Sequence, residues 1–167
     1  MAEKEQIFNS NIKSVGIFNF RNFYKFCYEW LVEEVGLDVM ETKYKEKLVG
    51  TEKEMEIEWE GETKFTDYFQ FKTKVVFEVK HLQNVEINEG GKKINTNKGE
   101  VKVTIKSFLV RDYLGKFESN AFYKFLRAVY ERWIILSRIK KFEIDIIQDS
   151  DNFLSQAKAF LDLEGKR

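Results

Sequence analysis

The segment from Lys43 to Lys80 alternates apolar and charged residues, and the sign of the charge changes from one stretch to the next. The charged positions are, in order, Lys43, Lys45 and Lys47, then Glu54, Glu56, Glu58 and Glu60, then Lys72 and Lys74. A period of two is typical of a β-strand that buries one face in a core. Opposite charges on neighbouring strands attract, whereas like charges repel. The pattern therefore predicts an antiparallel sheet with one wetted face, and it sets the order of the first three strands.

The first two strands are predicted at 39–48 and 53–60, joined by a two-residue Gly50-Thr51 loop of the type II′ kind. A turn closed there places Lys47 opposite Glu54, Lys45 opposite Glu56 and Lys43 opposite Glu58. On the other face it places Tyr44 beside Ile57 and Thr42 beside Trp59. Turn chemistry, charge and packing all favour this one register, and such agreement holds a strand against slippage.

The rest of the sheet is less regular in sequence. A third strand is predicted at 66–81, and a short strand at 85–87 precedes a glycine turn. The chain then returns at 92–113, where Gly99 and its neighbours indicate a bulge. The polar residues 1–17 predict an irregular arm or a short edge strand.

Helices are predicted before and after the sheet region in the sequence. The first spans 19–35, because Asn19 suits an N-cap and Gly36 suits a C-cap. A long helix is predicted from Ser119 or Asn120 to about 147, followed by a break at 148–151 and a short last helix. The long helix has apolar residues at spacings typical of a face that packs on a core. They are Phe122, Phe125, Leu126, Val129, Trp133, Ile139, Phe142 and Ile146.

These elements predict an α+β fold in a single domain over 1–167. A single antiparallel sheet of about five long strands forms a meander, packed on one face by an N-terminal helix and a long C-terminal helix plus a short terminal helix. The predicted layout is an arm at 1–17, a helix at 19–35, a sheet at 39–113 and helices at 119–164. The order of helix, meander and helix resembles helix-grip ligand-binding folds, a likeness of architecture that implies no function.

Composition restricts the classes of partner. Lys and Arg number 28, as do Asp and Glu, so no overall basic field attracts nucleic acid. One cysteine and one histidine argue against a disulfide framework and a thiolate or His-rich metal site, and no cofactor is expected. No transmembrane segment and no signal peptide are apparent, which predicts a cytoplasmic protein. A virion or another assembled particle is equally consistent with these features.

Several polar features are candidate sites, and each has a structural interpretation that we favour. His81 is a candidate general base or pH switch, but no acid-base partner can be placed beside it. Cys27 lies among aromatic residues on a helix face, where a free cysteine acts as a small hydrophobic residue. The glutamates at 54, 56, 58 and 60 are candidate ligands for a hard cation. A strand spreads them along one face opposite lysines, however, which favours a lattice of ion pairs.

Two further polar features are treated in the same way. The hairpin tip at 90–93, with Lys98, Lys102 and Lys106 beyond it, is the best candidate phosphate or nucleic-acid patch, but it lacks interleaved aromatic residues. Asp67 and the segment 111–113 place polar groups beside apolar surface, where a buried ion pair is either a site or a structural bond.

The aromatic content of 16% is the feature with most bearing on function. Apolar residues surround both predicted helices instead of keeping to one stripe, which indicates burial on more than one side. The residues of the long helix expected to mediate self-association are Tyr130, Ile134, Ile135 and Ile144. We therefore expect a non-enzymatic assembly protein that forms a homo-oligomer through its helices.

Two alternatives stay open. The first is a binding module with a pocket for a small apolar ligand between the sheet and the long helix. Its expected lining is Phe69, Phe71, Phe77 and Trp133. The second is an enzyme, which is the least favoured because no nucleophile-base pair, metal set or phosphate loop is apparent.

Overall fold

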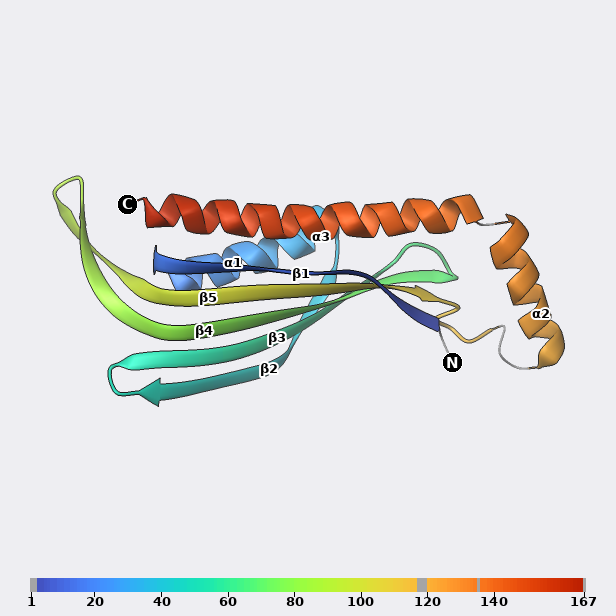
Figure 1. Ribbon diagram of the computed structural model, residues 1–167, viewed down its shortest axis with the longest axis horizontal. Helices are drawn as coiled ribbons and strands as arrows, with labels where there is room; N and C mark the ends of the chain where they lie inside the picture. The colour runs from blue at the N-terminus through green and yellow to red at the C-terminus, as the bar shows by residue number, and fades with distance from the viewer. Residues whose placement is uncertain (1–2, 117–119, 135, 167) are drawn as a thin grey trace.

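The computed structural model describes residues 3–116, 120–134 and 136–166, and shows an α+β fold. Five antiparallel strands form one sheet in the order β1-β5-β4-β3-β2, so β2 to β5 are a meander and β1 joins it beside β5 (Figure 1). The elements are β1 (Glu3–Phe18), α1 (Phe20–Glu29), the π-helical η1 (Trp30–Val35), β2 (Asp38–Val49), β3 (Glu52–Lys64), β4 (Phe69–Glu89), β5 (Lys92–Arg111), α2 (Ala121–Val129), the π-helical η2 (Tyr130–Ile134) and α3 (Leu136–Gly165).

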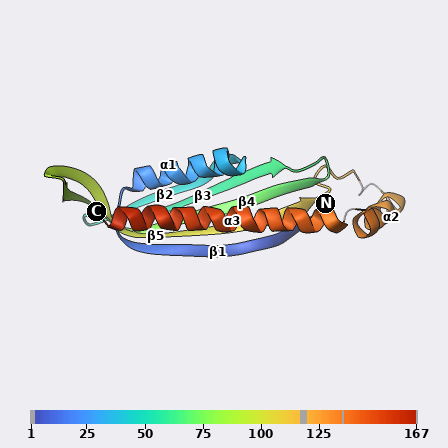
Figure 2. The same cartoon turned by 90° about the horizontal axis from the view of Figure 1, so that it is seen from above.

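The layers are a sheet with α1 and α3 side by side on one face (Figure 2). α3 runs along β1 and β5, and the ring of Phe160 on α3 meets Phe26 of α1 at 4.9 Å. α2 lies beyond the end of the sheet and turns away from the direction of α3 (Figure 1). No helix in the described part of the chain is both long and apolar enough to cross a membrane.

The predicted β2–β3 register is confirmed. Lys43, Lys45 and Lys47 pair with Glu58, Glu56 and Glu54, and Tyr44 pairs with Ile57. The expected neighbour of Trp59 was wrong, because a bulge at Thr42 shifts the register and brings Glu41 to that position. Local turn and charge chemistry thus determines the pairing up to the bulge.

The outer parts of the sheet correct three expectations. Residues 1–17 are no irregular arm: β1 is a strand of 16 residues that pairs with β5 along its length. β4 continues from Phe69 to Glu89, so the short strand expected at 85–87 is its second half. The bulge lies in β4 between Lys80 and Gln83 instead of in β5, where Gly99 faces it.

The N-terminal helix begins and ends at the residues predicted to cap it. Asn19 accepts a hydrogen bond from the backbone N–H of Asn22 at 3.0 Å, and Gly36 ends η1 in the left-handed conformation. Phe23 and Cys27 of α1 and Leu31 of η1 are buried against the sheet, as the apolar spacing predicted. The helix nevertheless changes from α to π geometry at Trp30.

The C-terminal helices differ from the expectation of one helix to about 147. η2 ends at Ile134 and α3 begins at Leu136, and α3 runs without a break through 148–151. Within this continuous stretch the hydroxyl of Ser150 is buried and lies 2.7 Å from that of Ser107 on β5. Asn120 caps α2 by accepting from the N–H of Tyr123, while Ser119 lies outside the described residues.

The β4 bulge generates a prediction for Gly99. A Cβ at this position would lie 2.9 Å from the Cα of Leu82 and 3.0 Å from the carbonyl oxygens of Lys80 and His81. Because these atoms belong to the backbone, Gly99→Ala should lower the free energy of unfolding by about 1–3 kcal/mol in urea titrations. Gly165→Ala is the matched control, because a Cβ added at Gly165 would have no neighbouring atom within 4 Å. Equal stability of the two variants would contradict the close approach.

Candidate functional site

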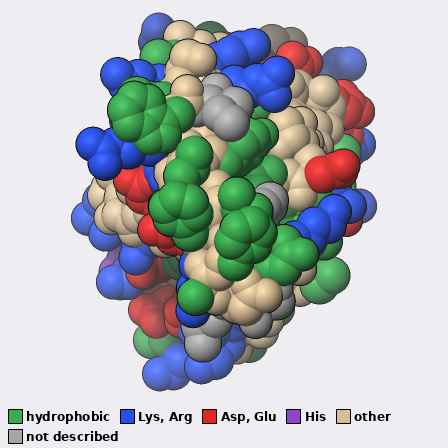
Figure 3. Space-filling model, turned by 90° about the vertical axis from the view of Figure 1, so that its right-hand side faces the viewer, with side chains coloured by type: hydrophobic (Ala, Val, Ile, Leu, Met, Phe, Trp, Pro, Cys, Tyr) green, Lys and Arg blue, Asp and Glu red, His purple; other side chains and the backbone are tan. Residues whose placement is uncertain are grey.

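The segment formed by α2 and η2 presents its apolar side to solvent. None of the residues of α2 is buried. Phe122, Phe125 and Trp133, which the sequence pattern assigned to a core-facing stripe, have exposed fractions of 64%, 63% and 75%. Large apolar side chains gather at this end of the molecule (Figure 3). We call the exposed side chains of Phe122, Tyr123, Phe125, Leu126, Trp133 and Leu136 the aromatic face.

The charged side of the same segment faces the protein. The side chains of Arg127 and Glu131 are only 14% and 17% exposed, and they form an ion pair at 3.3 Å. Tyr68, which precedes β4, donates to Glu131, and Nε of Arg127 donates to the Tyr68 hydroxyl at 3.1 Å. An amphipathic helix usually buries its apolar face, so this segment is inverted.

Two more ion pairs tie this network to the sheet. Arg127 pairs with Glu3 of β1 at 2.7 Å, and Arg111 of β5 pairs with Glu131 at 3.6 Å. Burial, and then the bond to Glu131, raise the pKa of Tyr68 well above its usual range. The phenol therefore stays protonated and keeps donating at neutral pH. The network fixes which side of α2 faces outward.

The residues expected to mediate self-association are dispersed. The ring of Tyr130 is half-buried and lies 5.6 Å from that of Tyr68, so it helps to anchor η2. Ile144 on α3 is exposed. The side chain of Ile134 and the whole of Ile135 lie outside the described residues. The aromatic face was missed as a surface because helical periodicity reveals an apolar side without showing what it contacts.

The residues expected to line a ligand pocket are not brought together. Phe69, Phe71 and Phe77 are fully buried on β4 and pack against other rings of the core, such as Phe142 and Trp59. Trp133 lies on η2, in solvent. The structure therefore places the three phenylalanines and the tryptophan in separate environments.

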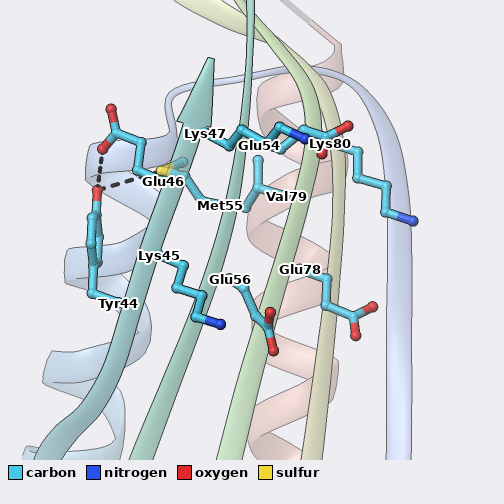
Figure 4. Close-up of a pocket in the computed structure, with 10 residues that line it drawn as sticks. All are labelled: Tyr44, Lys45, Glu46, Lys47, Glu54, Met55, Glu56, Glu78, Val79 and Lys80. Carbon is cyan, nitrogen blue, oxygen red and sulfur yellow. Dashed lines mark hydrogen bonds between the residues drawn. The ribbon is translucent and has the colours of Figure 1, made fainter. Parts of the chain in front are cut away.

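A hollow of about 690 Å³ lies at the end of the β2–β3 hairpin (Figure 4). The glutamate row of β3 meets lysines here: Lys43 pairs with Glu56 at 2.7 Å. Toward the middle of the sheet, Lys74 of β4 pairs with Glu58 at 3.6 Å. In the described residues, no three His, Cys, Asp or Glu side chains are grouped closely enough to hold a metal ion. The β3 glutamates and the neighbouring lysines thus form ion pairs, as the sequence pattern indicated.

The remaining candidate residues have structural surroundings. Burial raises the pKa of the Cys27 thiol, which disfavours the reactive thiolate. Asp112 is buried at a turn and accepts from the N–H of Lys116, whereas Asp67 is exposed. The hairpin tip at 90–93 is exposed, and β5 carries Lys102 and Lys106 away from it along the sheet. These residues do not converge on one site.

No family model, curated protein or solved structure was found that matches this chain. The physical features of the molecule therefore carry the functional argument. The most distinctive feature is the aromatic face of α2 and η2. It points to solvent because the charged side of the same segment is bound to the rest of the protein.

The anchoring network makes a testable prediction. Glu131→Ala removes a partner from Tyr68, Arg127 and Arg111, so the free energy of unfolding should fall by about 1–3 kcal/mol. Amide hydrogen exchange in α2 should also quicken. Glu29→Ala is the matched control, because its pair with Lys25 is exposed and should contribute no more than roughly 0.5 kcal/mol. Unchanged exchange in α2 would show that the network does not hold the helix.

His81 supplies a pH prediction. Its Nδ1 lies 2.7 Å from Glu52, and this bond raises the pKa of His81 above 6.5. The associated stabilisation is complete at pH values below 6.5 and is lost as the pH rises through the folded-state pKa. In NMR titrations of this single histidine, Glu52→Gln should lower the midpoint. Glu54→Gln should lower it less, because Glu54 acts only at longer range. Equal midpoints in all three proteins would exclude the bond.

Proposed function

We propose that this protein is a non-enzymatic assembly protein, in which two copies associate through their aromatic faces. The observation that carries this proposal is the inversion of the α2–η2 segment. Its charged side is tied to the protein by Arg127 and Glu131, while Phe122, Phe125 and Trp133 remain in water. Exposed aromatic rings of this kind mark surfaces that another molecule covers.

The size of the aromatic face supports a protein partner. The exposed parts of Phe122, Phe125 and Trp133 amount to about 400 Å², if each ring has roughly 200 Å² to bury. Tyr123 and Leu126 extend this area. The total is about two thirds of the roughly 800 Å² that each partner contributes to a standard interface. In a two-fold pair the same face serves both copies, so one surface is sufficient.

The charges around the aromatic face favour a protein over a lipid surface. Lys124 and Arg132 are exposed on the segment itself, and Glu3 and Glu5 are exposed on β1, which the network joins to α2. Both signs surround the apolar side chains in Figure 3. A polar rim of mixed charge around an apolar centre is typical of protein interfaces, whereas an anionic bilayer would repel the glutamates.

The other expectations stay predictions. A small apolar ligand or an enzymatic activity has no specific observation in its favour. The proposed homo-oligomer is compatible with the expected cytoplasmic location and with an assembled particle.

The proposal predicts a concentration-dependent dimer. Sedimentation of the wild-type chain, whose mass is 20.0 kDa, should show a species of twice that mass. Phe125→Asp and Trp133→Ala should each weaken the dimer at least about 30-fold, as expected for truncated aromatic anchors. Leu163→Asp is the matched control: Leu163 is 68% exposed but lies at the far end of α3 (Figure 1). Circular dichroism and urea midpoints would verify that all variants remain folded.

Three results would overturn the proposal. The first is sedimentation of the wild-type chain as a monomer at every concentration, and the second is dimerisation of Phe125→Asp and Trp133→Ala as tight as that of Leu163→Asp. A monomer that binds anionic vesicles, and loses this binding with Phe125→Asp, would assign the aromatic face to a membrane surface instead.

A further inference from the structure

A second surface, far from the aromatic face, is the outer edge of β2. This strand of 12 residues is the last in the sheet order, so the described structure gives it a partner on one side only. The backbone groups on the other side are free to pair with another extended chain. The stretch from Lys43 to Val49 is regular, because the bulge at Thr42 lies before it.

The wetted face near this edge presents glutamates on β3 and lysines on β2. On β4, Lys72 and Lys74 face glutamates of β3 farther along the strand, whereas Glu78 faces Glu56. On β2, Lys43, Lys45 and Lys47 face the opposite side of the same glutamate row. Because opposite charges on neighbouring strands attract, these lysines favour carboxylates on a strand added outside β2.

The lysines of β2 are not all neutralised within the chain. Lys43 pairs with Glu56 at 2.7 Å. Lys45 and Lys47 are exposed, and the described part of the chain offers them no ion pair. Figure 4 shows Lys45 and Lys47 beside the hollow at the end of the hairpin, on the strand that has no outer neighbour. Figure 4 shows both side chains reaching toward the glutamates of β3, and without an ion pair they can also meet carboxylates of a strand added outside.

The opposite face of the same edge leaves two apolar side chains uncovered, with Glu46 between them in an ion pair with Lys53. The side chain of Tyr44 is 50% exposed and that of Leu48 is 71% exposed, because α1 and α3 lie over the other strands. A purely protective edge would carry its lysines without leaving apolar side chains in water on the other face. The β2 edge therefore combines a basic row, two exposed apolar side chains and an open backbone.

We propose that the β2 edge binds an extended segment of a partner protein as a sixth strand. The bound segment alternates acidic and apolar residues. Its carboxylates face Lys45 and Lys47, and its apolar side chains cover Tyr44 and Leu48. Backbone hydrogen bonds supply affinity in this mode, while the alternate side chains supply specificity.

A second copy of the same edge does not fit. In an antiparallel pair of β2 strands centred on Lys45, this lysine meets its own copy and Lys43 meets Lys47. Three like-charged rungs destabilise such a pairing. This register therefore disfavours self-pairing while an acidic strand meets no such repulsion, and the β2 edge is independent of the association proposed for the aromatic face.

The test uses the full-length protein and a labelled eight-residue peptide that alternates valine and glutamate. Fluorescence anisotropy measures binding, and NMR hydrogen exchange measures protection of amides in β2. We expect saturable binding with new protection confined to residues 43–49. The double variant Lys45→Glu/Lys47→Glu should weaken binding at least about tenfold, because two attractions become repulsions.

Two controls separate strand addition from general attraction between charges. The double variant Lys102→Glu/Lys106→Glu changes the net charge equally but on the internal strand β5, and it should bind as the wild type does. Peptides N-methylated on every second residue, in each of the two phases, should differ, since only one phase blocks the hydrogen bonds toward β2.

The proposal is overturned by any of three outcomes. They are no saturable binding, equal weakening by the β5 charge reversals, and equal binding of both methylated peptides. Binding of a valine-lysine peptide as tight as that of the valine-glutamate peptide would likewise reject the charge complementarity to the β2 lysines. Phe125→Asp, which acts on the other surface, should leave peptide binding unchanged.

Discussion

The contact between Trp59 and Phe77 is the centre from which the rest of the core is organised. Their ring centroids lie 4.6 Å apart on neighbouring strands β3 and β4. Phe23 and Tyr24 of α1 pack on this pair, and Phe23 also meets Phe160 of α3 at 5.8 Å. One aromatic cluster therefore joins the sheet to both helices, and each ring pair adds about 0.5–1.5 kcal/mol beyond area burial.

The cluster also satisfies its buried polar group. Nε1 of Trp59 donates to the hydroxyl of Tyr24 at 3.0 Å, and Tyr24 donates to Glu41. Burial, together with the bond to Glu41, raises the pKa of Tyr24 to about 12, so the phenol remains a donor at physiological pH. A buried indole N–H without a hydrogen-bond partner would destabilise the fold. The hydrogen bonds from Trp59 through Tyr24 to Glu41 supply that partner, so the rings can pack together.

Features set by neighbouring residues could be predicted from the sequence, and features set by distant ones could not. The hairpin register follows from a two-residue turn and three charge pairs, and Asn19 and Gly36 bound the first helix through local hydrogen bonds and backbone conformation. The pairing of β1 with β5 has no local signal, since its partners are about a hundred residues apart.

The candidate site illustrates the same limit. Spacing revealed an apolar side at Phe122, Phe125 and Trp133, but not that Arg127 and Glu131 would turn this side outward. That orientation depends on Tyr68 and Glu3, from distant segments of the chain. A helix face that packs on the core of its own protein and one that binds another molecule have the same periodicity.

The position of β1 has a consequence for how the chain acquires its structure during synthesis. Glu3 pairs with Arg111, so the first strand to leave the ribosome has no partner until the last strand has emerged. The β2–β5 meander, built from adjacent hairpins, can form earlier. α3 then lies across β1 and β5 together. The two ends of the chain thus close the molecule last: loss of β1 leaves β5 as an open edge, and loss of α3 uncovers the apolar face of β1 and β5.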